Sequence, residues 1–186
     1  MTSSKYDADK HHRRSIRLKG FDYSQPGAYF VTICTHGKEC LFGNVDDGEM
    51  VLNELGRIVW EIWQSLPARY PQIKLGSAVV MPNHFHTIIE IPTDVGVIHE
   101  LPLRRTGIDV NDPKIRRKML LPKVIGYFKM NSARRINELL NTPGTPLWQR
   151  NYYDRIIRDK EEYMRIAEYI EYNPLNWQED EEYIAG

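Results

Sequence analysis

Hydrophobic residues along the chain fall into short runs rich in β-branched and aromatic residues and into longer runs with a helical period. The short runs predict strands over residues 28–35, 73–80, 84–91 and 152–158. The longer runs predict a helix that starts after Asn53 and two others over residues 120–140 and 160–172. A smaller hairpin is expected from residues 40–43 and 49–52, on either side of the turn residues 46–48.

Residues that favour helix ends support these boundaries. Asn53 is a suitable N-cap for the first helix, and Pro67 and Pro71 are expected to end that helix because proline lacks a backbone N–H. Asp159 and Glu162 have the spacing of a capping box at the start of the last helix, which Pro174 stops.

The order of these elements predicts the fold class. Strand–helix–strand–strand–helix–strand is the order of the ferredoxin-like split βαβ unit. We therefore predict an α+β, ferredoxin-like βαββαβ antiparallel sheet with helices on one face, an extra hairpin near the N-terminus and a further helix at the C-terminus. The 186 residues suit a single domain over 1–186. Residues 1–12 are expected to be disordered, and residues 92–118 are expected to form a basic surface insertion.

The composition narrows the class of protein. Hydrophobic residues make up 41% of the chain and charged residues 27%, which is typical of a soluble globular protein. The chain has no apolar run long enough for a membrane span and no apolar segment of a secretory signal near its N-terminus. The two cysteines, Cys34 and Cys40, form no CxxC pair, so we expect a reduced, cytoplasmic setting without a disulfide framework.

The distribution of charge points to a polyanionic partner. Lys plus Arg and Asp plus Glu are equal at 25 each, but the charges are segregated along the chain. Basic residues concentrate in 10–19 and 104–135, whereas 179–182 is an acidic run in the tail. Basic stretches on a neutral chain suit nucleic acid as a partner. The alternative is a solvated face or a flexible arm.

Two histidines flank one apolar residue in the segment His84-Phe85-His86. Side chains at positions i and i+2 of a strand point to the same face, so His84 and His86 are expected side by side while Phe85 enters the core. Two imidazoles on one strand face are able to hold one metal ion. The alternative is a pair of ordinary histidines on a half-buried strand, because short motifs also arise by chance.

A second group of candidate residues lies near the C-terminus. Tyr169 and Asn173 are four residues apart, so they share one face of the last predicted helix. The amide oxygen of Asn173 is able to complete a His-His-Asn site with His84 and His86, with Tyr169 one turn away. Such a ligand set suits Mg²⁺ or Mn²⁺ better than zinc. A cation beside a phenol stabilises the phenolate and favours its attack on a phosphate.

Each of these residues also has a plain structural interpretation. Tyr169 is able to pack on the sheet as an ordinary amphipathic tyrosine, and Asn173 before Pro174 is able simply to end the helix. By residue type alone, the rival nucleophiles are Tyr152, Tyr153, Tyr163 and Tyr172.

Six segments in order resemble the REP-associated tyrosine transposases, where REP stands for repetitive extragenic palindrome. These enzymes belong to the single-tyrosine HUH (His-hydrophobic-His) transposases of bacterial insertion sequences. The segments are 14–18 (RSIRL), 27–32 (GAYFVT), 41–43 (LFG), 81–86 (MPNHFH), 148–154 (WQRNYYD) and 169–174 (YIEYNP). The resemblance extends over about residues 13–177 and implies a ferredoxin-like catalytic domain that cuts and rejoins single-stranded DNA.

The resemblance also implies roles for individual residues. His84 and His86 match the metal-binding histidines, and Tyr169 matches the nucleophile that forms a 5′-phosphotyrosine link and releases a 3′-OH. Asn173 stands where the wider family carries a third metal ligand, often Gln. The implied substrates are imperfect hairpins with a short flanking guide sequence. The insertion at 92–118 departs from the family pattern, because it is longer and more basic, so the details of DNA recognition stay open.

Candidate DNA contacts follow from charge and aromatic character. The candidates for phosphate contacts are Arg13, Arg14, Arg17, Lys19, Lys129, Arg134, Arg135 and Arg150, with Arg104, Arg105, Arg116 and Arg117 as further candidates in the insertion. The candidate stacking platforms for bases are Trp148, Tyr152 and Tyr153, although Trp148 also suits a place in the core.

Three functions are compatible with these residues. The first is a strand transferase that depends on Mg²⁺ or Mn²⁺ and acts on single-stranded or hairpin DNA through Tyr169. The second is a non-catalytic regulator that binds hairpin DNA. The third is a metal-dependent phosphoesterase that uses water as its nucleophile. Both a monomer and a homodimer with shared sites are compatible with the sequence.

Overall fold

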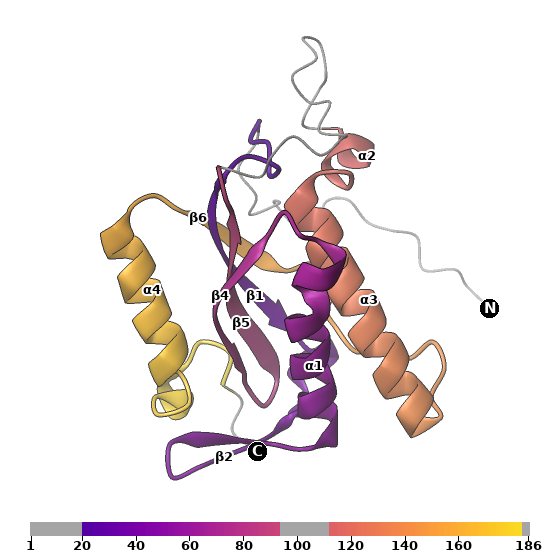
Figure 1. The fold of residues 1–186 in the computed structure, drawn as a ribbon. Helices are drawn as coiled ribbons and strands as arrows, with labels where there is room; N and C mark the ends of the chain where they lie inside the picture. Colours follow the sequence, from indigo (N-terminus) through magenta and orange to yellow (C-terminus); the bar gives the residue numbers. More distant parts are fainter. Residues whose placement is uncertain (1–19, 94–111, 184–186) are drawn as a thin grey trace, which may run out of the picture.

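The computed structural model describes residues 20–93 and 112–183. Its main sheet has four strands, β1 (Gly27–Cys34), β4 (Lys74–Val80), β5 (His84–Ile91) and β6 (Tyr153–Ile157). They lie in the order β4-β5-β1-β6, and every neighbouring pair is antiparallel (Figure 1). This order places the first and third main strands side by side in the centre, as in the ferredoxin-like fold. The prediction of an α+β antiparallel sheet is therefore confirmed.

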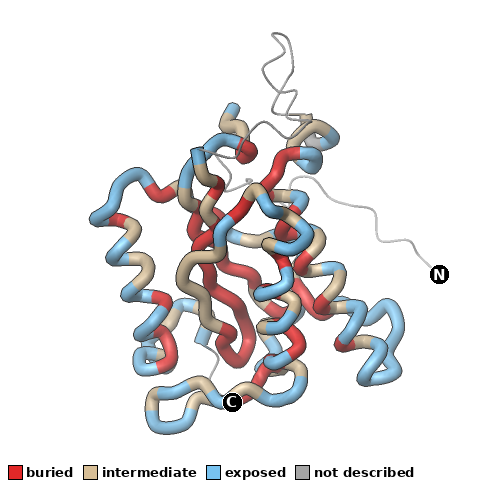
Figure 2. The backbone as a smooth tube through the Cα atoms, viewed as in Figure 1, coloured by how far each residue is buried: buried red, intermediate tan, exposed pale blue. Residues whose placement is uncertain are grey.

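Two helices cover one face of the sheet. Helix α1 (Glu54–Arg69) and helix α3 (Leu120–Leu140) contact each other and bury their apolar sides against the strands. Rings from three elements meet there, because Trp63 of α1 and Phe128 of α3 both pack against Phe85 of β5. Figure 2 shows the buried residues gathered in the sheet and on the helix sides that face it.

The C-terminal helix lies on the opposite face of the sheet from α1 and α3 (Figure 1). Helix α4 (Lys160–Tyr172) contacts β4 and β5. Its Ile170 belongs to a second, smaller core with Phe30, Ile88 and Ile157 of the strands. The sheet therefore has apolar contacts on both faces, and side chains that point toward α4 come from every second residue of each strand.

Most predicted boundaries agree with the structure, and two differ for local reasons. Helix α1 continues past Pro67 to Arg69, because a proline in the last turn removes one backbone hydrogen bond without stopping the helix. The first arm of the hairpin is β2 (Gly43–Asp46), which pairs with β3 (Glu49–Leu52) and lies later than the predicted 40–43. Leu41 and Phe42 instead donate their N–H groups to the carbonyl of Pro82.

Three short helical segments complete the described chain. They are η1 (His36–Lys38), α2 (Pro113–Arg116) and η3 (Trp177–Glu179). Helix α2 lies within the stretch predicted as an insertion, of which residues 94–111 fall outside the described residues. The predicted disorder of 1–12 and the predicted DNA contacts Arg13, Arg14, Arg17, Lys19, Arg104 and Arg105 also fall outside them. Among the helices of the described residues, none is long and apolar enough to cross a membrane.

Candidate active site

The two histidines of the HxH segment point to the face of the sheet that α4 covers. In the register of β1 and β5, His84 lies opposite Cys34 and His86 opposite Thr32. Phe85, between them, points into the core on the other face. Both imidazoles are buried, with exposed fractions of 0% for His84 and 3% for His86. The predicted placement of the pair is therefore what the structure shows.

Hydrogen bonds fix the tautomer of His84. The side-chain amide of Asn83 donates from Nδ2 to the carbonyls of Lys38 and Glu182, so its Oδ1 is the acceptor for Nδ1–H of His84 at 2.9 Å. The lone pair of His84 Nε2 then stays available, and this atom has no hydrogen-bond partner in the described part of the chain. Burial first, and the neighbouring His86 second, lower the pKa of His84 to about 3, so the ring is neutral and able to bind a metal.

His86 lies between a threonine and the candidate nucleophile. Its Nδ1 is 2.8 Å from the hydroxyl of Thr32, and its Nε2 is 3.2 Å from the phenol oxygen of Tyr169. The phenol donates its hydrogen to Oδ2 of Asp180 at 2.9 Å, so His86 Nε2 is the donor toward the phenol oxygen in this arrangement. The predicted proximity of Tyr169 to the histidine pair is therefore present within one chain.

Helix α4 carries both C-terminal candidates to the site. The carboxylate of Asp159 caps the helix by accepting the N–H of Glu162, and Ile170 anchors the helix on the sheet. Tyr169 and Asn173 follow one turn apart. Asn173 is buried; its Nδ2 donates to Oδ2 of Asp180 at 2.6 Å, and its Oδ1 has no hydrogen-bond partner among the residues described.

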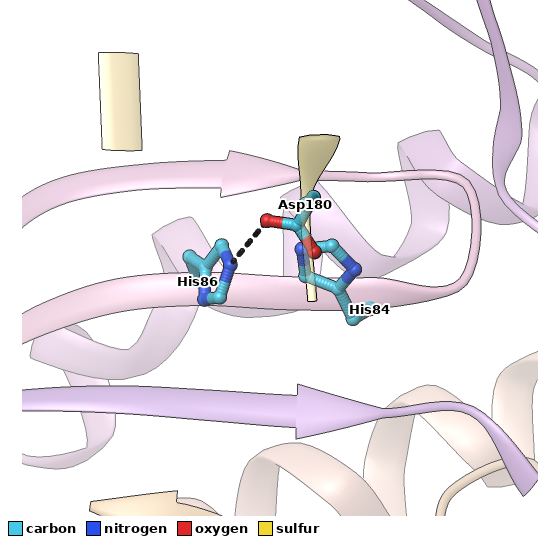
Figure 3. A group of neighbouring side chains, drawn as sticks. All are labelled: His84, His86 and Asp180. Atoms are coloured by element: carbon cyan, nitrogen blue, oxygen red, sulfur yellow. Dashed lines mark ion pairs between the residues drawn. The ribbon is translucent and has the colours of Figure 1, made fainter. Parts of the chain in front are cut away.

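Asp180 is a site residue that the sequence analysis missed. It follows η3, and its carboxylate points at the histidine pair (Figure 3). Its Oδ2 lies 3.9 Å from Nε2 of His86 and accepts the hydrogen bonds from Tyr169 and Asn173. The sequence showed Asp180 only as part of an acidic run, and nothing in that pattern separates it from Glu179 or Glu181.

The rest of the tail holds Asp180 in place. Glu182 forms an ion pair with Lys38 at 2.7 Å, and its carbonyl accepts the amide of Asn83. The ring of Trp177 lies 5.8 Å from the ring of His84, centre to centre. Burial, together with the nearby Glu182, raises the pKa of the Cys34 thiol to about 12. The tail thus closes the site from the side opposite the sheet.

The charges in the site favour a protonated phenol and an ionised carboxylate. Burial first, and then Asp180, raise the pKa of Tyr169 well above its ordinary value. Burial opposes ionisation of Asp180, but its contacts with His86 and Asn173 outweigh burial and hold the pKa of Asp180 well below its usual range. The arrangement therefore pairs a neutral phenol with a carboxylate anion.

These residues fit a divalent cation. One ligand atom each from His84, His86 and Asp180 lie within 4.8 Å of one another. Bonds of about 2.1 Å place two ligand atoms at most about 4.2 Å apart, so an ion would draw these side chains slightly closer together. The unpartnered Nε2 of His84 and Oδ1 of Asn173 are buried polar atoms of the kind that a cation satisfies. Nitrogen and oxygen ligands of this kind suit Mn²⁺, Mg²⁺ or Zn²⁺.

Comparison with other proteins places the chain in a family. No family model matches it. It is 40% identical, over 185 residues, to an uncharacterized protein of Haemophilus influenzae, and the match covers 98% of this chain and 99% of the other. The two chains belong to one family.

A solved structure shares the fold. It is that of a REP-associated tyrosine transposase bound to a REP hairpin, with a TM-score of 0.56 and 15% sequence identity. The match covers 87% of this chain and 73% of the transposase chain. The fold is therefore that of the protein class that the sequence segments resemble, which confirms the resemblance at the level of the fold.

The predicted aromatic platforms fall in three different places. Tyr153 is opposite Thr32 in β1, on the face of the site, and its exposed fraction is 37%. Tyr152, the preceding residue, is half-buried and packs against the main core. Trp148 is wrong as a stacking platform, because it is 6% exposed, packs against Phe128 and donates its indole N–H to Ser132.

The predicted basic contacts also differ in their surroundings. Lys129 donates from Nζ to the carbonyls of Gln149 and Arg150, so it holds the loop before β6. Arg134 pairs with Glu138 on the same helix, and Arg135 pairs with Glu61 of α1; all four side chains are exposed. Arg150 is exposed in the loop that Lys129 holds. Within the described part of the chain, the hydrogen-bond and ion-pair partners named here are not among the site residues around His84 and His86.

Proposed function

We propose that the chain is a metal-dependent DNA strand transferase that uses Tyr169 as its nucleophile on single-stranded or hairpin DNA. The observation that carries this proposal is the position of the phenol oxygen, 3.2 Å from Nε2 of His86 and within a buried group that suits a cation. The shared fold with a REP-associated tyrosine transposase supports the same reaction class.

In this proposal His84 and His86, with Asp180 and Asn173, would hold Mg²⁺ or Mn²⁺. The cation would supply positive charge that polarises a phosphate and favours the phenolate. Asp180 accepts the hydrogen bond of the phenol and so orients its oxygen; the proton of Tyr169 passes to water when the cation lowers the pKa of the phenol. The phenolate oxygen attacks phosphorus, a Tyr169 O–P bond forms and the P–O3′ bond breaks. The leaving oxygen takes a proton and becomes a free 3′-OH, and the reverse attack by a 3′-OH rejoins strands.

The test is the formation of a covalent adduct. Purified protein is incubated with labelled single-stranded hairpin DNA, with and without Mg²⁺ or Mn²⁺, and separated under denaturing conditions. We expect an adduct only with metal, and none with Tyr169→Phe. Tyr172→Phe is the matched control, because Tyr172 is on the same helix and 49% exposed, and it should keep the adduct. An undiminished adduct with Tyr169→Phe would refute the proposed nucleophile.

A second candidate is a regulator that binds hairpin DNA without cutting it. The observation in its favour is that the site is closed: the phenol of Tyr169 and the side-chain amide of Asn173 both donate hydrogen bonds to Oδ2 of Asp180. This function predicts salt-dependent binding of hairpin DNA and no adduct with wild-type protein in either metal. Turnover by the wild type eliminates it.

A further inference from the structure

A groove lies along α3, between this helix and the chain segment that follows it. Its volume is about 690 Å³, which is within the range of small-ligand sites. One wall is α3, with Lys123, Gly126 and Met130, and the other is the loop up to Tyr152, which leads into β6. The groove is separate from the candidate active site, because neither His84 nor His86 lines it.

The wall from α3 contains an exposed glycine, Gly126, with open space beside it among the described residues. Gly126 is exposed in the helix interior, and a Cβ built there would meet no described atom within 4 Å. A glycine inside a helix is less favourable than alanine. Since no packing contact among the described residues requires a glycine here, its effect in this part of the structure is to leave room in the groove. Met130, one turn later on the same wall, is 62% exposed. Both features suit close approach of a ligand to the helix backbone.

The charge of the groove selects an anionic ligand. The basic residues that line it are Arg117, Lys123, Lys129 and Arg150, and no acidic residue of the described chain does so. Lys129 donates hydrogen bonds to backbone carbonyls of the loop. The side chains of Arg117, Lys123 and Arg150 are exposed, so they are accessible to an anion. The groove also has exposed apolar lining from Met130 and Pro146. Cations above an apolar surface are the combination that binds an unpaired nucleotide, by phosphate contacts and by burial of the base.

The loop of the groove connects directly to the active site. Tyr152 lines the groove, and the next residue, Tyr153, pairs with Thr32, whose hydroxyl contacts His86. Tyr152 directly precedes β6, so one short chain segment places Tyr152 at the groove and Tyr153 on the face of the site. Because β6 is at the edge of the sheet, a bound strand is able to pass around it from one face to the other.

We propose that this groove binds an unpaired nucleotide in the single-stranded part of the DNA substrate, and that the strand then runs over Tyr153 to Tyr169. The proposal rests on the proposed function for its substrate class. It adds a binding site, formed by α3 and the loop before β6, and a path between that site and the reacting phosphate.

The first test measures binding without catalysis. A fluorescein-labelled DNA hairpin with mixed-sequence single-stranded flanks is titrated with the full chain in EDTA, and its anisotropy is recorded. Gly126→Gln keeps a good helix former but fills the groove, so we expect affinity to fall about tenfold because the nucleotide can no longer enter it. Leu139→Gln, on α3 but not in the groove, is the matched control and should leave affinity unchanged. Gly126→Ala should raise Tm and so show that the site folds with a side chain present.

The second test separates phosphate contacts from general charge. Lys123→Gln should lower the slope of log affinity against log salt by about 0.7–1, as expected when one phosphate contact is lost. Lys74→Gln is the matched control, because Lys74 is exposed on β4 at the opposite edge of the sheet. Equal slopes for the two variants would overturn the proposal.

Crosslinking then locates the strand. With 4-thiothymidine in the single-stranded flank, we expect crosslinked peptides from 126–130 or 147–153, and crosslinks confined to other segments would contradict binding in the groove.

If Gly126→Gln binds as tightly as the wild type while Tyr169 still forms its adduct, the proposed groove site is wrong and the proposed function stands. If Gly126→Gln binds more weakly but Tyr169→Phe keeps the adduct, the groove stands and the proposed nucleophile fails.

Discussion

The phenol of Tyr169 donates a hydrogen bond of 2.9 Å to Oδ2 of Asp180, which joins helix α4 to the acidic tail directly beside the histidine pair. The same oxygen of Asp180 accepts the amide of Asn173 at 2.6 Å. One carboxylate therefore positions two of the residues on which the proposed chemistry depends.

Asp180→Asn should weaken metal binding. The change keeps the shape of the side chain but removes the negative charge that a divalent cation needs, so we expect the affinity for Mn²⁺ to fall by about tenfold or more. Isothermal titration calorimetry with Mn²⁺ measures this directly. Glu181→Gln, on an exposed neighbouring residue, is the control for general tail charge. Equal affinities of Asp180→Asn and wild type would show that Asp180 is not a ligand.

Asn83→Ala should also weaken metal binding, although Asn83 is not itself one of the proposed metal ligands. Its Oδ1 accepts Nδ1–H of His84 and so keeps Nε2 free for a metal. Loss of such a partner commonly costs about 10–100-fold in affinity. The same calorimetry applies, with Asn176→Ala as the control, because Asn176 is an exposed amide whose contact is on the surface. Unchanged Mn²⁺ affinity would mean that the backbone alone orients the ring.

The stability of the metal-free protein should fall as the pH falls from about 6.5 toward about 3. Burial lowers the pKa of His84 to about 3 in the folded chain, whereas in the unfolded chain it is about 6.5. Between these values the unfolded state binds more protons, so the free energy of unfolding decreases as pH decreases, by at most about 1.4 kcal/mol per unit for this group. Urea unfolding in EDTA at several pH values measures the slope, and His84→Gln should have a shallower one. Parallel curves would contradict the assignment.

Phe128→Ala should destabilise the fold without altering the residues of the site. Phe128 is fully buried and joins Trp63 and Phe85 behind the histidines, so its truncation leaves a cavity and should cost about 3–5 kcal/mol. Met130→Ala, on the same helix but 62% exposed, should cost less than about 1 kcal/mol. Urea unfolding compares the two. A small effect of Phe128→Ala would mean that the core relaxes to fill the space.

The local pattern of the chain was sufficient for much of the fold. Helices α3 and α4 have the predicted bounds, because their apolar periodicity, the Asp159 cap of α4 and the proline and glycine residues after α3 are short-range signals. The prediction of the hairpin was less accurate. Its turn is where we expected it, with positive φ values at Asp47 and Gly48. Its first arm is not, because Leu41 and Phe42 donate to the carbonyl of Pro82, a partner that no local pattern reveals.

The sequence by itself determined that His84 and His86 share one strand face and that Tyr169 and Asn173 share one helix face, because both statements follow from the geometry of a single element. Tertiary structure decided that these two faces meet, that Asp180 lies between them, and that Trp148 is in the core. Those facts depend on contacts between segments far apart in the chain, where the packing of the whole molecule sets the distance and the spacing of residues does not.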